Sequence, residues 1–206
     1  EYGGQKYRFQ HLASFVGAFL KIKVARGAPH TVIDNLNARV NAWWVMAAVI
    51  GLALMAGKTG VIVLFTLISF VAFREYATLT PTRRGDHWAL LVSFFIVLPF
   101  QYFLVWIEWY GVYTIFIPVY VFLALPLMCA LSGDTRDFMQ RTATLQWRLM
   151  VTAFCLSHVP ALLTLAIPGY EGRGAFLIVF LVLVVQSSDV LQYVWGKLLG
   201  KRRIAP

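Results

Sequence analysis

The sequence has few charged residues and few cysteines, and it lacks the common catalytic motifs. Only 13% of its 206 residues are charged, against about 25% in soluble globular domains. Cys129 and Cys155 stand alone inside apolar runs, so the sequence offers neither a disulfide framework nor a metal-binding cysteine motif. No P-loop, GxSxG or HExxH motif occurs, which excludes the enzyme classes that depend on those signatures.

Apolar residues take the place of the missing charges. They make up 60% of the chain, and the mean hydropathy is +0.71, a composition typical of a polytopic membrane protein. The formal charge of +9 would favour nucleic-acid binding in a soluble protein. In a membrane protein, basic residues gather beside the spans and meet anionic lipid, so we expect membrane lipids and no nucleic acid as partners.

Apolar runs of helical length predict an all-α fold, a membrane bundle of about six transmembrane helices. The expected spans are 41–57, 59–73, 87–107, 109–131, 146–168 and 174–195. The first two favour a tight hairpin over one long bent helix, because roughly 33 helical residues would extend ~50 Å across a ~30 Å core.

The segment before the first span is amphipathic. Five apolar residues share one helix face at i, i+3, i+4, i+7 and i+8 spacing: Leu12, Phe15, Val16, Phe19 and Leu20. The stretch suits a helix lying on the membrane, or the end of a span that begins earlier. We therefore divide the chain into an interfacial segment, 1–40, and a transmembrane domain, 41–206.

Lys and Arg are distributed unevenly between the two sides that six spans define. If the N-terminus lies in the cytoplasm, all Lys and Arg residues except Lys58 and Arg173 fall on cytoplasmic segments. This asymmetry follows the positive-inside rule, so both ends of this chain are expected in the cytoplasm.

Asp189, inside the last expected span, is the clearest candidate for a functional residue. It lies about six residues, or ~9 Å of helix, before the cytoplasmic end, where ionisable groups are costly and usually functional. Gln192, Tyr193 and Lys197 follow at i+3, i+4 and i+8 and share its helix face, and Ser188 belongs to the polar stretch beside it.

These residue types favour chemistry on phosphates at a membrane surface. A carboxylate can hold Mg²⁺ together with substrate phosphates, and Lys and Arg bind phosphate oxygens. The alternative is structural: Asp189 pairs with a helix cation to fix packing, while the basic tail anchors the helix. Weaker candidates are His158, Glu108, Asp134 and Asp137, of which Asp134 also suits a helix N-cap.

The last 20 residues, SSDVLQYVWGKLLGKRRIAP, resemble part of the bacterial phosphatidate cytidylyltransferases (CDP-diacylglycerol synthases). The matching positions are Asp189, Tyr193, Gly196, Lys197, Gly200, Lys201, Arg203, Ala205 and Pro206. Leu199 stands where phenylalanine is common. Upstream segments such as TRRGDHWAL and FCLSHVPALLTLAIPGYEGR also resemble one branch of the family, so the resemblance covers nearly the whole chain.

The resemblance implies a reaction, its cofactor and its place. CTP and phosphatidic acid would give CDP-diacylglycerol and pyrophosphate with Mg²⁺, in phospholipid biosynthesis at the bacterial inner membrane. Asp189 would be the catalytic carboxylate and one metal ligand. The substrate-binding residues would be Ser188, Gln192, Tyr193, Lys197, Lys201, Arg202 and Arg203. For the oligomeric state, a homodimer is one possibility.

This sequence departs from the family pattern after Pro206. The family continues with a Ser-Pro-x-Lys-Thr motif, further spans and an acidic signature that carries the main metal carboxylates. We therefore expect this chain to be an inactive portion of a longer enzyme. Two functions of other classes stay open: a transporter or channel subunit that uses Asp189, and a non-catalytic membrane scaffold.

We predict that these 206 residues alone form no CDP-lipid, because the main metal carboxylates are expected beyond Pro206. The measurement is transfer of label from radiolabelled CTP to lipid in liposomes that contain phosphatidic acid. Labelled lipid above the level of protein-free liposomes would contradict this expectation.

Overall fold

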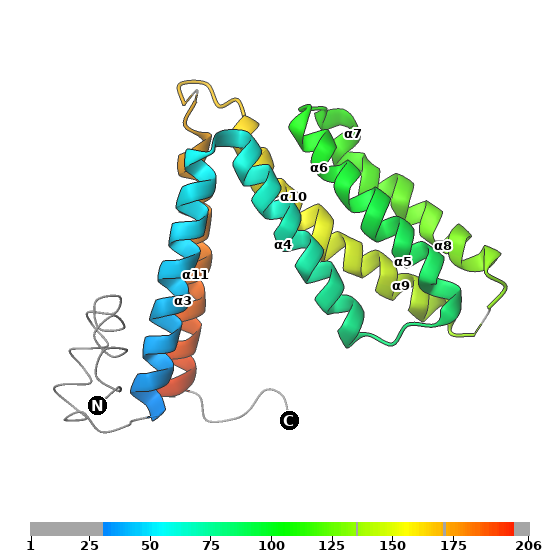
Figure 1. The fold of residues 1–206 in the computed structure, drawn as a ribbon, viewed down its shortest axis with the longest axis horizontal. Coiled ribbons are helices and arrows are strands. Elements are labelled where there is room, and N and C mark those ends of the chain that lie inside the picture. The colour runs from blue at the N-terminus through cyan, green and yellow to red at the C-terminus, as the bar shows by residue number, and fades with distance from the viewer. Residues whose placement is uncertain (1–30, 135, 171, 200–206) are drawn as a thin grey trace, which may run out of the picture. The chain divides into compact units, whose positions relative to one another are not determined.

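The computed structural model describes residues 31–134, 136–170 and 172–199 (Figure 1), apart from the side chains of 31–40, 193–194 and 197–199. The chain divides into two compact units, and the boundary along the sequence falls between Ala56 and Gly57. All regular structure in the described ranges is helical, which confirms the predicted all-α class. The amphipathic face expected at residues 12–20 lies outside the described residues, and residues 31–40 of that segment form the start of the first described helix.

The first unit contributes α3 (Thr31–Met55). Its described apolar part, Asn41–Met55, is shorter than a full membrane span. The helix ends before Gly57, whose φ of 76° is in the left-handed region that glycine adopts without a steric penalty. Residues 41–73 therefore form two helices and not one long helix.

The second unit holds five helices that are long and apolar enough to cross a membrane, counted over the described residues. The first is α4 (Gly57–Leu79) and the last is the part Gly174–Gln192 of α11 (Gly174–Leu199). The three between them are built from consecutive helical segments. These segments are η1 (Arg84–Asp86), α5 (His87–Val92), η2 (Ser93–Val97) and α6 (Leu98–Trp106); α7 (Tyr110–Ile115), η3 (Phe116–Val121) and α8 (Phe122–Leu131); and α9 (Phe138–Leu149), η4 (Met150–Cys155), α10 (Leu156–Ala161) and η5 (Leu162–Thr164). The protein is thus a helical membrane protein.

Short π-helical segments, η2, η3 and η4, widen each of the three segmented helices near its middle. Pro118 lies inside η3, and Pro99 follows η2 closely. Proline has no backbone N–H for the helical ladder, and a local π turn is one way to satisfy the freed carbonyls inside a membrane.

The first four of these five helices pack side by side, with contacts of α4 to α6 and α10, and of α8 to α5 and α9 (Figure 1). Leu98, Leu104 and Ile117 are fully buried between them. Buried polar side chains bond to one another across helices: Ser69 on α4 lies 2.5 Å from the Tyr102 hydroxyl on α6. Such pairing is required where no water can satisfy a polar group.

Two helices extend beyond the spans expected from hydropathy. The helix α4 runs to Leu79 instead of residue 73, and the helix of the fifth expected span begins at Phe138 instead of residue 146. Hydropathy detects only the apolar part of a helix, whereas α9 continues through polar residues because one of its faces is buried.

The start of α11 packs closely on η5. A Cβ on Gly174 would lie 2.7 Å from the Leu163 carbonyl oxygen and 2.9 Å from that of Leu162, so only glycine fits. One turn later Ile178 is fully buried. This backbone contact sets where α11 begins.

We predict that Gly174→Ala destabilises the protein by about 1–3 kcal/mol, because the new methyl group meets backbone atoms that cannot rotate away. The measurement is thermal unfolding of the purified protein in detergent. Gly111→Ala is the matched control: Gly111 also lies in the first turn of a helix, and a Cβ added to it would meet nothing within 4 Å. Equal melting temperatures for the two variants would contradict the proposed contact.

Candidate functional site

The predicted site residues lie on or just beyond the last third of α11. The side chains of Ser188, Asp189 and Gln192 are exposed. Tyr193 and Lys197 belong to the same helix, but their side chains are outside the described part of the chain. Lys201, Arg202 and Arg203 lie outside the described residues altogether.

The polar residues of α11 occupy two adjoining faces. Ser188 and Gln192 line an open hollow on one face, together with Ser187 and Trp195. Asp189 does not line this hollow. Successive side chains point about 100° apart around the helix axis, so Asp189 points away from the direction of Ser188. Gln192 follows Ser188 by four positions and Asp189 by three. Around the helix axis it therefore lies between those two residues, at the edge of the hollow nearer to Asp189.

Asp189 makes no hydrogen bond or ion pair with any residue that the structure describes. The packing salt bridge considered above therefore has no partner in that part of the chain. A carboxylate with free oxygens in an apolar helix is chemically suited to a cation or to a polar ligand.

The described residues contain no group of three or more His, Cys, Asp or Glu side chains that could hold a metal ion. Asp189 fits the part of a Mg²⁺ site that a single carboxylate supplies, since Mg²⁺ often takes one or two carboxylates plus phosphate oxygens and water. The expected magnesium site therefore remains a prediction.

A second polar cluster, of which the sequence had pointed only to Asp134, lies at the end of the bundle where α5 and α9 begin. The carboxylate of Asp86 is 3% exposed and accepts hydrogen bonds from Arg141 Nε at 3.0 and 3.1 Å and from Nη2 at 2.6 Å. Arg141 Nη1 donates to the Asp134 carbonyl oxygen at 2.9 Å and pairs with its carboxylate at 3.0 Å. We call these three residues the Asp86 cluster.

The Asp86 cluster ties the turn before α5 to the turn before α9. Asp86 also accepts the Arg83 backbone N–H at 3.2 Å, which closes the short η1 turn. Asp134 does not cap α9 as the sequence suggested, because Asp137 occupies the N-cap position and the Asp134 carboxylate turns to Arg141. The charges and hydrogen-bonding groups of the Asp86 cluster are paired with one another and with the neighbouring backbone, so its geometry indicates a structural role.

Arg148 lies two helical turns after Arg141 on the same buried face of α9 and is fully buried. Its Nη2 donates to the Thr80 hydroxyl, and its guanidinium carbon lies 5.5 Å from the Phe73 ring centre and 5.4 Å from that of Tyr76. The signal in the sequence was the spacing of Arg141, Leu145 and Arg148 at i, i+4 and i+7, which places two arginines on one face.

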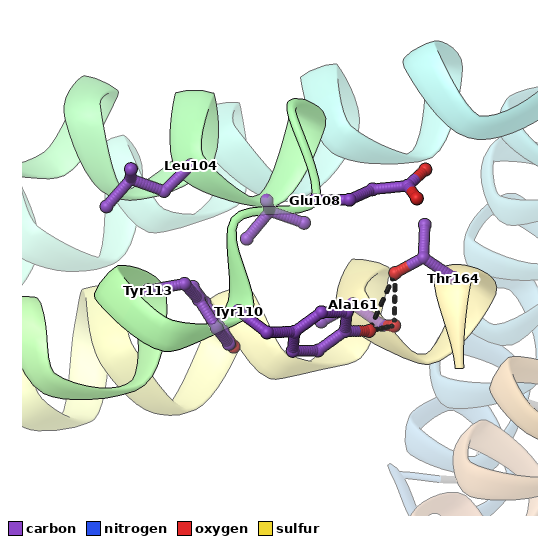
Figure 2. A pocket seen from close by; sticks show the side chains of 7 residues that line it. Leu104, Glu108, Tyr110, Tyr113, Ala161 and Thr164 are labelled. Carbon is purple, nitrogen blue, oxygen red and sulfur yellow. Dashed lines mark hydrogen bonds between the residues drawn. The ribbon is translucent and has the colours of Figure 1, made fainter. Parts of the chain in front are cut away.

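The opposite end of the bundle is closed by packing. Figure 2 shows a small space between α6, α7 and α10, where the Tyr110 hydroxyl bonds to the Ala161 carbonyl oxygen at 3.0 Å and lies 2.7 Å from the Thr164 hydroxyl. The space leaves no room for a water molecule. Glu108 forms an ion pair with Lys58 beside it. We assign no ligand to this end.

The side chain of His158 is exposed but contacts α7 and the preceding turn of its own helix. Its Nδ1 lies 2.8 Å from the Phe154 carbonyl oxygen, and its ring centre is 4.9 Å from that of Tyr113. These contacts favour a hydrogen-bonding and ring-packing role for His158 over a ligand role.

Comparison with known proteins identifies the class. This helical membrane chain belongs to the cytidylyltransferase family, whose model matches residues 37–206. A relative, the uncharacterized protein YnbB of Escherichia coli strain K12, is 29% identical over 197 residues. The match covers 95% of this chain and 62% of the relative, so the chain spans under two thirds of that protein's length. No solved structure matches.

We predict that Asp86→Ala lowers the free energy of unfolding by about 3–5 kcal/mol, because it leaves the Arg141 charge buried beside a single remaining carboxylate. Asp137→Asn is the control, since Asp137 pairs with Arg83 at 3.0 Å on the surface and asparagine tolerates its left-handed N-cap backbone, so the loss of its charge should cost below about 1 kcal/mol. Unfolding in mixed micelles measures both. Similar losses in the two variants would argue against a buried, structural Asp86 pair.

Proposed function

We propose that the protein acts in the transfer of a cytidylyl group from CTP to the phosphate of phosphatidic acid. The products are CDP-diacylglycerol and pyrophosphate, and the pathway is phospholipid biosynthesis. Membership of the cytidylyltransferase family supports the use of CTP. The observation that carries the proposal is Asp189, an exposed carboxylate without a described partner on an apolar helix.

The side of the membrane follows from the alternation of helices. Successive spans reverse direction, so the end of α11 and the Asp86 cluster belong to the same side. The Lys and Arg residues of the spans gather there: Arg74, Arg83, Arg84, Arg136, Arg141 and Arg148. Lys58 and Arg173 belong to the other side. By the positive-inside rule, the side richer in Lys and Arg would be the cytoplasmic side, where CTP is present. The membrane would be a bacterial inner membrane.

The residues of α11 would position the two substrates. A phosphate oxygen of the lipid attacks the α-phosphorus of CTP, the bond from that phosphorus to the β-phosphate bridging oxygen breaks, and pyrophosphate leaves. Such a transfer depends on alignment and charge neutralisation more than on covalent help from the protein. Bound Mg²⁺, with Asp189 as one ligand, would neutralise charge on the triphosphate.

Each polar group of the site has a part in this scheme. The Ser188 hydroxyl and the Gln192 amide can donate hydrogen bonds to phosphate or sugar oxygens beside the hollow that they line. Tyr193 follows Asp189 by four positions on the same helix face, so its hydroxyl would bind a substrate oxygen beside the carboxylate. The cationic side chains would neutralise the phosphates of CTP or lipid: Lys197, Lys201, Arg202 and Arg203.

We predict that the full-length protein in liposomes converts CTP and phosphatidic acid to CDP-diacylglycerol, and that Asp189→Asn lowers kcat at least ~100-fold. The amide keeps the shape of the side chain but removes the charge that holds a cation. Asp137→Asn, an exposed carboxylate on the same side, is the control and should retain wild-type turnover. Near-normal turnover of well-inserted Asp189→Asn would refute the site, and absence of CDP-lipid in the wild type would refute the function.

A further inference from the structure

Arg148 carries a buried charge that the described residues do not neutralise. Its exposed fraction is 0%. Nη2 donates to the Thr80 hydroxyl, but Nε and Nη1 have no acceptor within the part of the chain that the structure describes. A buried guanidinium without a carboxylate and with unsatisfied N–H groups is costly, so such a group is expected to have an anionic partner in the working protein.

Asp86, the buried carboxylate among the described residues, cannot serve as that partner. Asp86 gives both carboxylate oxygens to Arg141, and Arg141 is further held by the carboxylate of Asp134. The aromatic rings of Phe73 and Tyr76 flank the Arg148 guanidinium and stabilise a cation, but they accept no strong hydrogen bond. The unused N–H groups of Arg148 therefore match an oxyanion that comes from outside the bundle.

An exposed tryptophan beside Arg148 indicates a depth near the lipid head groups. Trp147, its neighbour in α9, is 64% exposed. Tryptophan concentrates at the membrane–water interface. Arg148 is about ten residues, or ~15 Å, from the start of α9, and the polar first turns of that helix extend toward the aqueous side.

A ligand can reach the guanidinium only after a neighbouring side chain moves, because Arg148 is fully buried. Tyr76 and Thr80, at the end of α4, are half-buried and contact Arg148 directly. Thr80 lies just beyond the last helical residue of α4, and its hydroxyl donates to the Tyr76 carbonyl oxygen at 2.9 Å. Movement of these two half-buried side chains would open a path to the guanidinium.

We infer that Arg148 binds a phosphate monoester, the head group of the phosphorylated lipid substrate, through Nε–H and Nη1–H. A guanidinium presents N–H groups in a planar fork that matches two phosphate oxygens. The inference rests on the proposed function for the identity of the lipid. The same chemistry could come from a phosphate of CTP, and the test below separates the two sources.

The test measures binding without turnover. The full-length protein in detergent is titrated with dioctanoyl phosphatidate, and separately with CTP. Dioctanoylglycerol, which lacks the phosphate, is the ligand control. We expect Arg148→Gln to weaken phosphatidate binding at least ~10-fold with CTP binding unchanged. Arg148→Lys should be intermediate, because an ammonium keeps the charge and loses the fork.

Arg136→Gln is the matched control variant, since Arg136 is an exposed arginine on the same side of the bundle. Loss confined to CTP would support a phosphate site and assign it to the nucleotide. Unchanged affinity for both ligands in Arg148→Gln overturns the inference, as does an equal loss in Arg136→Gln. If Arg148→Gln does not fold, Arg148→Lys provides the same comparison.

A second readout separates this inference from the proposed function. If the wild type forms no CDP-lipid but binds phosphatidate through Arg148, the proposed function is refuted and the Arg148 site stands. If the wild type turns over and Arg148→Gln has an unchanged KM for phosphatidate, the Arg148 site is refuted and the proposed function stands. A phosphatidate-dependent rise in melting temperature that Arg148→Gln abolishes would further support binding, because a purely packing role predicts the same rise in both proteins.

Discussion

The arrangement of charges in the described bundle depends on the buried ion pair between Asp86 and Arg141. Neither group could be buried alone beside a membrane, because the loss of hydration would exceed any packing gain. Together they satisfy three guanidinium hydrogen bonds and join the turn before α5 to the first turn of α9. The pair thereby sets the register of α9 against the helices that it packs on.

That pairing has a consequence for the deeper arginine. Because Asp86 and Asp134 are both occupied by Arg141, the positive charge of Arg148 has no counter-ion among the described residues. Arg141 thus forms ion pairs within the fold, whereas Arg148 has unused N–H groups that suit an anion from outside the bundle. The same helix face supports both roles, at positions separated by two turns.

The α11 site shows how far helical spacing could predict function. An apolar run with a carboxylate indicated a polar face near Asp189, and the helix places Gln192 beside it as expected. Spacing alone did not reveal that Ser188 and Asp189 lie on different faces of α11, with the hollow on only one of them. Arg141 and Arg148 were missed because both were counted only as basic residues outside or at the edge of a span, whereas α9 begins at Phe138.

By itself the sequence determined the class: an all-helical membrane protein of the cytidylyltransferase family, with its spans in the order observed. Length and hydropathy of a span are local properties, so they can be read from a single segment. Only the tertiary structure decided which charges are neutralised, because Asp86 and Arg141 are 55 positions apart and Arg148 and Thr80 are 68 apart. Charges on one helix meet a partner, or lack one, only when other helices have packed against it.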